Sequence, residues 1–426
     1  MFRHPLLISL LTFLVLGLAL IIRVPMGASP DEAAHWQYIQ YVVANHELPV
    51  FKAEMVPPTP GYEFHQPPLY YALAAPGWAI APAGIENAWA RIVSLLCGAL
   101  TLIFIWKSAR LLFPADLSIA ILATGFAALW PLHLSVSAGS NNDALGGLWA
   151  AALFWCGARV LINGTNWRDA ALMGLFVGLG ALTKNTVLVV AAVMLAALLA
   201  ARPQENAPSR IVNLLIALAV VMIVAGPWWA RNMMLYGDPF AYRLFSQAAT
   251  AGTPGLAQIS ADWFSAFTYW RGMVWLLFMT AWGFFGGVNS ALAATTPFNF
   301  DGPVMREIWL LPFVAVFALS SVAAPLGWRK ARASTEITLA QKSVIWFWLI
   351  GLALVVLAWI QFAYGHFSGG QARYLHTALL PMCVFGAAGW RALWGEGRAL
   401  HIASWALAAL MLGMTLLNLL VWKTLV

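Results

Sequence analysis

Charged residues are scarce in this chain. Of its 426 residues, 9% are Asp, Glu, Lys or Arg and 62% are hydrophobic, including 23 Trp and 24 Phe. A mean hydropathy of +0.78 lies far from that of a soluble domain and excludes that class. The composition predicts an all-α polytopic membrane protein. With no internal repeat and no polar tract, we expect a single transmembrane domain over residues 1–426, without a separate soluble domain.

Cysteine is also rare. Cys97, Cys156 and Cys383 all lie in apolar runs and share no metal-binding spacing, so we expect buried thiols without a disulfide. The formal net charge is +7. Its Lys and Arg residues are dispersed between apolar runs and form no basic cluster, which argues against a nucleic-acid partner.

Apolar runs are plentiful, and a membrane-spanning helix needs about 20 such residues. The first run follows Arg3 and lacks a small-residue cleavage site, so we expect an uncleaved span. Together the runs predict about 11 transmembrane helices, at 6–24, 89–106, 116–135, 143–162, 169–183, 186–201, 211–230, 308–327, 343–363, 375–390 and 400–421.

A twelfth apolar run, Phe264–Gly287, is assigned by charge. If it crossed the membrane, the cluster Arg329, Lys330 and Arg332 would move to the outside, against the positive-inside rule. We therefore place it on, or re-entrant in, the outer face. Two large outer loops result: 25–88, expected to be catalytic and to contain interfacial helices, and 231–307, expected on the substrate or acceptor side. Most of the acidic residues then lie outside.

Two adjacent acids, Asp31 and Glu32, follow the first span. Ser29 and Glu32 have the spacing of a helix capping box, with Pro30 favoured at the first helical position. That interpretation explains Glu32. It leaves Asp31, one helical turn before His35, without a structural role. From these residues alone, a helix cap and a catalytic acid both remain open for the pair.

Further polar residues recur at the outer boundaries. Pro67 and Pro68 hold His65 and Gln66 at the entry to a helix, although spacing alone favours an ordinary loop-to-helix turn over a functional role. At the start of the span near residue 143, Ser140 and Asp143 suit a capping box, and Asn141 or Asn142 are alternative caps. A second role for this segment in binding a sugar or the first loop is left open.

Four cations stand at the predicted outer face, where the positive-inside rule would not place them: Lys184, Arg231, Arg271 and Arg373. Each alone is an ordinary boundary cation. Together they suit a lipid-linked phosphate, because Arg binds phosphate oxygens with two hydrogen bonds and Lys neutralises them as a point charge.

The outer histidines give no metal motif. Four of them are expected outside, but none forms a paired ligand pattern with a neighbouring acid: His35, His46, His65 and His366. We predict no metal ligands and no firm cofactor, and leave a divalent cation open.

In order along the chain, these motifs resemble the GT-C superfamily of integral-membrane glycosyltransferases, which includes protein mannosyltransferases and lipid A aminoarabinose transferases. The resemblance extends from about Ser29 to Pro381. It rests on Pro-Asp-Glu-x-x-His at 30–35, Pro-Pro-Leu-Tyr-Tyr at 67–71, Ser-Asn-Asn-Asp-Ala-Leu at 140–145, Gly-Leu-Gly-Ala-Leu-Thr-Lys at 178–184, Trp-x-x-Arg-Asn at 228–232, Tyr-Gly-Asp-Pro at 236–239 and Arg-Tyr at 373–374.

The resemblance implies an inverting transferase that moves a sugar from a polyprenyl-phosphate carrier to a glycan, lipid or protein acceptor at the outer face of the membrane. It implies Asp31 as the general base, with Glu32 in support. Gln66 departs from the aminoarabinose transferases, which carry Lys before the Pro pair. The expected substrate-binding residues are His35, His65, Gln66, Tyr70, Asn142, Asp143, Lys184, Arg231, Arg271, Arg373 and Tyr374.

Two other classes remain. A lipid-linked saccharide transporter or flippase would carry charges near the middle of several spans, whereas here they lie mainly at span ends. A non-catalytic glycan-assembly subunit is the third interpretation. For the enzyme we expect a bacterial inner membrane, with the site on the periplasmic or extracellular side.

Overall fold

The computed structural model describes residues 4–56, 59–252, 255–256, 263–282, 329 and 337–424. These residues are almost entirely helical, which confirms the predicted all-α fold. The elements are α1 (Pro5–Arg23), α2 (Glu32–Asn45), η1 (Tyr62–His65), α3 (Leu69–Ile80), α4 (Glu86–Leu112), α5 (Leu117–Leu129), α6 (Pro131–Ala138), α7 (Asp143–Asn163), α8 (Trp167–Ala181), α9 (Val187–Ala200), α10 (Arg210–Tyr236), α11 (Tyr242–Gly252), α13 (Trp263–Trp282), α16 (Leu339–Gly365), η4 (Phe367–Gly370), η5 (Ala372–Ala378), α17 (Leu379–Trp394) and α18 (Arg398–Thr424).

The predicted apolar runs within the described residues are all helical, whereas α2, α3 and α11 lie outside those runs. Among the described residues, six helices are long and apolar enough to cross a membrane: α1, α4, α7, α10, α16 and α18. The run at 116–135 is a pair, α5 and α6, bent by 53° before Pro131, and would make a seventh span. Helices α8, α9 and α17 have 15, 14 and 16 residues. The predicted run at 308–327 lies outside the described residues, and the number eleven is not confirmed.

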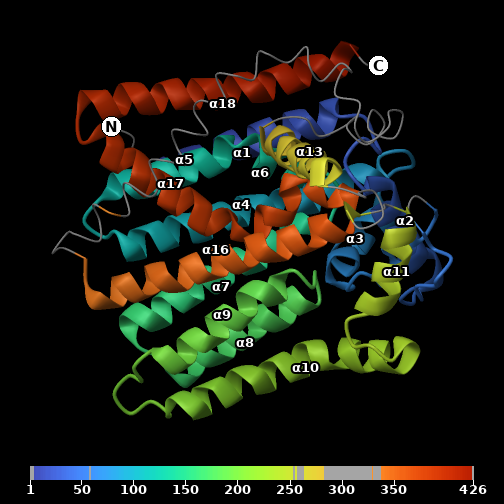
Figure 1. Ribbon diagram of the computed structural model, residues 1–426, viewed down its shortest axis with the longest axis horizontal. Coiled ribbons are helices and arrows are strands. Elements are labelled where there is room, and N and C mark those ends of the chain that lie inside the picture. Colours follow the sequence, from blue (N-terminus) through green and yellow to red (C-terminus); the bar gives the residue numbers. More distant parts are fainter. Residues whose placement is uncertain are drawn as a thin grey trace.

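The long helices run side by side, and the shorter elements of the predicted outer segments gather at one end of them (Figure 1). Helices α2, α3 and α11 lie at that end, whereas α1 begins at the opposite end. Helix α7 is the most buried of the six candidate spans. Small residues allow close packing around it and its neighbours. A Cβ at Gly174 of α8, for example, would lie 2.3 Å from the backbone oxygen of Ala217 in α10.

The predicted outer-face run at 264–287 is a continuous helix, α13, as far as Trp282, and its glycines 283, 286 and 287 lie outside the described residues. Helix α13 is hydrogen-bonded to the start of η5, next to Arg373. Thr280 Oγ1 accepts a hydrogen bond of 2.7 Å from the backbone N–H of Ala372, and Trp130 Nε1 donates to the Ala281 oxygen at 3.0 Å. The helix therefore supports η5.

The predicted capping box at Ser29 and Glu32 is wrong. Helix α2 begins with Asp31 as its N-cap residue, and no side chain makes a capping hydrogen bond there. Glu32 is instead fully buried in an ion pair with Arg91 of α4, with Nε to Oε1 and Nη2 to Oε2 distances of 2.8 Å. The Glu32 carboxylate also accepts hydrogen bonds from the backbone N–H groups of Gly27 and Ser140.

Arg91 completes this junction with its remaining donors. It donates to the backbone oxygens of Ile21, Val24 and Pro25 at the end of α1. One buried ion pair thus connects α1, α2 and α4 with Ser140, just before α7. A buried charge is stable only with such a full set of partners, so the pair fixes where the outer loop leaves the bundle.

We predict that Arg91→Met lowers the free energy of unfolding by about 3–5 kcal/mol, because it leaves the Glu32 carboxylate buried without a countercharge. Denaturant unfolding of the purified protein in detergent measures the change. The double variant Glu32→Gln/Arg91→Met should be more stable than Arg91→Met alone, and Arg23→Gln, at an exposed position on α1, serves as the control. Equal stability of Arg91→Met and wild type would contradict this assignment.

Candidate active site

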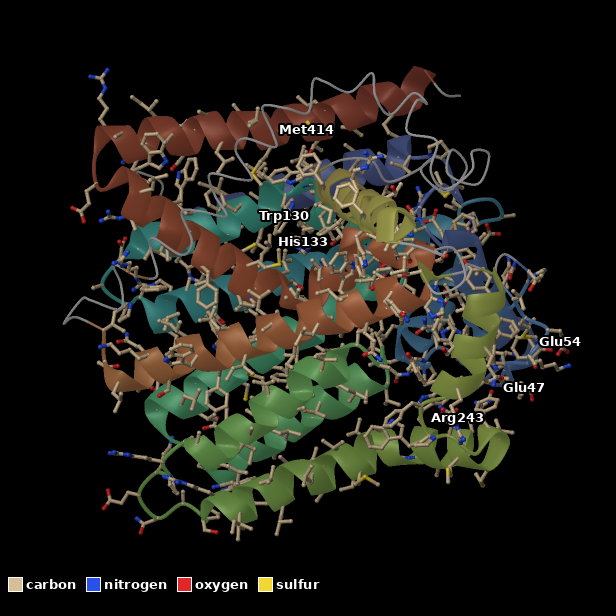
Figure 2. All side chains as sticks on the ribbon, in the orientation of Figure 1. Glu47, Glu54, Trp130, His133, Arg243 and Met414 are labelled. Atoms are coloured by element: carbon tan, nitrogen blue, oxygen red, sulfur yellow. The ribbon has the colours of Figure 1, made fainter. Side chains whose placement is uncertain are left out.

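A cavity of about 850 Å³ opens at the end of the bundle where α2 and α11 lie. Figure 2 shows Arg243, which lines its α11 side, at the same end of the molecule as Glu47 and Glu54 of the first outer loop. Its lining combines two sets of side chains, named here the polar wall and the apolar wall. The polar wall contains Asp31, His35, Glu63, Lys184 and Arg373. The apolar wall contains Leu188 and Val189 of α9 and Val355, Ala358, Trp359 and Phe362 of α16.

Asp31 points into this cavity because its backbone turns there. Its φ of 58° lies in the left-handed region, which Asp tolerates better than most residues. The carboxylate makes no cap and is engaged on both oxygens. Tyr62 Oη donates to Oδ1 at 2.6 Å, and Arg373 Nη2 pairs with Oδ2. Burial alone would raise the pKa of Asp31, but the attraction of Arg373 and these hydrogen bonds hold that pKa well below its usual range.

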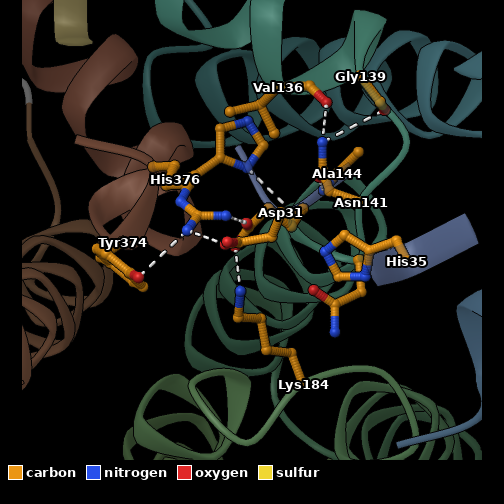
Figure 3. Close-up of polar contacts among 12 residues, drawn as sticks. Asp31, His35, Val136, Gly139, Asn141, Ala144, Lys184, Tyr374 and His376 are labelled. Carbon is orange, nitrogen blue, oxygen red and sulfur yellow. Dashed lines mark hydrogen bonds and ion pairs between the residues drawn. The ribbon is translucent and has the colours of Figure 1, made fainter. Parts of the chain in front are cut away.

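Four charges alternate in sign here, and three of them, Lys184, Arg373 and Asp31, line the cavity. Lys184 Nζ lies 2.6 Å from Asp143 Oδ1, and Arg373 Nη1 lies 3.6 Å from Asp143 Oδ2. Arg373 then reaches Asp31 with its other terminal nitrogen. Figure 3 shows how Asp31 and Lys184 converge from different elements, with Tyr374 beside them. These four charges sum to zero, which makes their burial tolerable.

Tyr374 and His376 position this chain of charges. The Tyr374 ring lies under both cations, 5.1 Å from the Arg373 guanidinium carbon and 5.9 Å from Lys184 Nζ. His376 Nδ1 is 3.3 Å from the Asp143 backbone oxygen, and its Nε2 is 3.0 Å from Nδ1 of buried His133. A Cβ at Gly147 would lie 2.3 Å from His376 Nδ1, so only glycine lets η5 approach α7 this closely.

Three titratable side chains complete the polar wall. His35 Nδ1 is 2.9 Å from Tyr71 Oη, and burial lowers the pKa of His35. Burial also lowers the pKa of His65 to about 4; its ring stacks on Phe245 at a centroid distance of 4.1 Å. Glu63 is 6% exposed, and its Oε2 has no hydrogen-bond partner. Burial, with a smaller effect of Asp31, raises the pKa of Glu63 against the opposing effect of His35.

Gln66 and Asn142 also line the cavity, and they contact each other. Asn142 Nδ2 donates to Gln66 Oε1 at 3.0 Å and to the Thr183 backbone oxygen at 3.2 Å. The predicted capping box of Ser140 and Asp143 is wrong, because Asn141 accepts the hydrogen bond from the Ala144 N–H at 3.2 Å and Asp143 turns to the cations. Asn142 occupies the N-cap position of α7 without a capping hydrogen bond from its side chain, and Asn141, one residue earlier, supplies the side-chain acceptor at this helix start.

Five predicted site residues do not line the cavity. Asp143 is buried and pairs with Lys184 and Arg373, which do line it. Glu32 pairs with Arg91, and Tyr70 is buried, donating to the Ala90 oxygen at 3.0 Å. Arg231 Nη2 donates to the backbone oxygens of Leu48 and Pro49. The contacts of Glu32, Tyr70 and Arg231 give these three residues structural roles in holding the segment 25–88. The fifth residue, on α13, is Arg271.

Sequence reasoning missed Glu63 and Arg243 in the cavity and Arg91 behind it. Arg91 had a signal, since a cation inside an apolar run requires a buried partner. Glu63 had none, because its environment is created by α2 and η1 together. Among the described residues, no group of three or more His, Cys, Asp or Glu side chains is arranged to hold a metal ion.

The site and fold together define a helical membrane protein with a charged cavity at one end. A profile of the family described as dolichyl-phosphate-mannose-protein mannosyltransferase matches residues 65–230. No protein with a curated description matches the chain. The three motif regions at 67–71, 140–145 and 178–184 fall within the matched segment.

Solved structures extend the likeness to the whole fold. The apo oligosaccharyltransferase of Archaeoglobus fulgidus aligns with a TM-score of 0.55 at 14% identity, over 99% of this chain and 55% of that one. The oligosaccharyltransferase AglB from the same archaeon, in complex with an inhibitory peptide and a dolichol-phosphate, gives 0.50 at 15% identity over the same shares. ArnT from Cupriavidus metallidurans, bound to undecaprenyl phosphate, gives 0.43 at 12% identity over 91% and 77%.

The chain therefore shares its fold with the archaeal oligosaccharyltransferase, and the predicted resemblance to GT-C membrane glycosyltransferases is confirmed at the level of the fold. It spans about 55% of the length of the archaeal structures that it matches.

We predict that Glu63→Gln becomes more stable than wild type as pH rises. A carboxyl whose pKa is raised in the folded state binds its proton more tightly there than in the unfolded state. The free energy of unfolding of the wild type therefore falls as the pH rises above the unfolded-state pKa, by up to ~1.4 kcal/mol per pH unit. Gln cannot ionise and escapes this loss. Melting temperatures between pH 4 and 8 measure the difference, with exposed Glu47→Gln as control; parallel curves for wild type and Glu63→Gln would contradict it.

Proposed function

We propose that this protein is an inverting glycosyltransferase that moves a sugar from a polyprenyl-phosphate carrier to an acceptor at the outer face of the membrane. One observation carries the proposal: the cavity joins a wall of paired charges to an apolar wall built from α9 and α16. Such a cavity matches an amphipathic donor, whose phosphate would meet Lys184 and Arg373 while its isoprenoid chain follows the apolar wall.

The family profile and the archaeal fold support this donor class, since the profile is described by a dolichyl-phosphate sugar and the AglB complex contains a dolichol-phosphate. For this chain we propose a bacterial inner membrane and a site on its periplasmic side. The outer segments 25–88 and 231–307 would then receive donor and acceptor within one transmembrane domain.

The chemistry needs few groups. An acceptor heteroatom attacks the anomeric carbon, the bond from that carbon to the carrier phosphate breaks, and the phosphate leaves with the electron pair. The acceptor's proton passes to the Asp31 carboxylate, which lies in the cavity beside the cations. The cations hold the negative charge that collects on the departing phosphate. Asn142, Gln66, His35 and Glu63 offer hydrogen bonds to sugar hydroxyls.

We predict that Asp31→Asn lowers sugar transfer at least ~100-fold, because a general base contributes about 10²–10⁴-fold. Glu47→Gln, an exposed outer acid at the end of the same helical segment, is the matched control and should keep wild-type activity. The assay incubates purified protein with labelled polyprenyl-phosphate sugars and a panel of glycan, lipid and protein acceptors. Wild-type turnover by a folded Asp31→Asn variant would refute Asp31 as the base.

The same assay in sealed vesicles separates the competing functions. Transfer to an acceptor supports the enzyme. Passage of the labelled lipid across the membrane without transfer would identify a transporter, and neither activity across the panel would favour a non-catalytic assembly subunit.

A further inference from the structure

Both oxygens of the carboxylate proposed as the base interact with neighbouring side chains. Asp31 gives one oxygen to the Tyr62 hydroxyl and the other to the Arg373 guanidinium. A carboxylate stabilised by a cation is a weak proton acceptor, because protonation would sacrifice the ion pair. The resting arrangement is therefore well ordered but poorly suited to removing a proton from an acceptor.

Both cations, Lys184 and Arg373, are also in ion pairs. Lys184 lies 2.6 Å from Asp143, and Arg373 is shared between Asp143 and Asp31. A carrier phosphate entering this wall would add negative charge to four charges that already sum to zero. Its binding becomes favourable when one of the cations changes partner.

Arg373 is the cation that can change partner and still keep an ion pair. It contacts both Asp31 and Asp143, the latter at 3.6 Å, and its buried Nε has no hydrogen-bond partner to lose. Lys184, in contrast, holds a single short contact. A guanidinium also offers parallel donors that fit two oxygens of a phosphate, so it can keep one nitrogen near Asp143 while the other turns.

We propose that Arg373 exchanges its Asp31 partner for the carrier phosphate, so that donor binding itself releases Asp31 to act as the base. Arg373 is thus both a phosphate ligand and a positioning residue that keeps Asp31 inactive in the empty site. The exchange rests on the proposed function, because it requires a phosphate-bearing donor in this cavity. It makes proton removal conditional on the donor's presence.

The test is a double-mutant cycle on binding of undecaprenyl phosphate, without sugar, to the purified full-length protein. Asp31→Asn releases Arg373 in advance and should tighten binding about tenfold, since charge pairs at close range couple strongly. Arg373→Gln should weaken binding by a similar factor. In the Arg373→Gln background, Asp31→Asn should give no tightening, because no guanidinium remains to be released.

Two further variants sharpen the cycle. Tyr62→Phe removes the hydrogen bond to the other Asp31 oxygen but leaves the Arg373 pair in place, so its affinity should match that of wild type. Arg373→Lys keeps the charge without the guanidinium fork and takes the place of Arg373→Gln if the latter does not fold. Thermal unfolding of each variant establishes that it is folded.

Equal tightening by Asp31→Asn in both Arg373 backgrounds would reveal a simple charge effect and overturn the exchange. An unchanged or weakened affinity of Asp31→Asn would also overturn it, while leaving the proposed donor class in place. Absence of undecaprenyl phosphate binding by the wild-type protein would instead count against the proposed function, and the exchange would fall with it.

Discussion

The alternating charges of Lys184, Asp143, Arg373 and Asp31 are the constraint on which the site depends. In a largely apolar protein, each of these groups is tolerable only because its neighbour has the opposite sign. The four come from separate parts of the chain, so their pairing fixes the segment before α2, the start of α7, the α8–α9 connection and η5 relative to one another. The cavity beside them is a consequence of that arrangement.

The two adjacent acids at the start of α2 have different roles because the backbone turns at Asp31 and directs their side chains to opposite sides. Asp31, in the left-handed conformation, faces the cavity and Arg373, while Glu32 faces the interior and Arg91. The Glu32 pair anchors the outer loop to α1 and α4. A rigid anchor one residue away is what allows Asp31 to be held at a defined place in an otherwise irregular segment.

Prediction from the sequence succeeded best where a residue's role follows from its own surroundings. Apolar runs located the long described helices but not α3 or α11. A cation or acid at the end of a run placed Asp31, Lys184 and Arg373 near one another. It failed where the partner was distant. Arg231 stands at the expected boundary, yet its guanidinium serves the carbonyls of Leu48 and Pro49. Glu63 looked like an ordinary loop acid, because burial by other elements is not visible in its neighbours along the chain.

The amino-acid sequence alone indicates that lipid is the solvent of this protein and that its backbone is helical. Composition and the length of apolar runs are local properties, and in lipid a backbone with no water to bind must satisfy its own hydrogen bonds as a helix. Which acid pairs with which cation depends on the tertiary packing of the helices. Asp31 and Arg373 are 342 positions apart, and Glu32 and Arg91 are 59 apart. Many pairings of the same acids and cations would neutralise charge equally well, and the packing of helices selects the one that is observed.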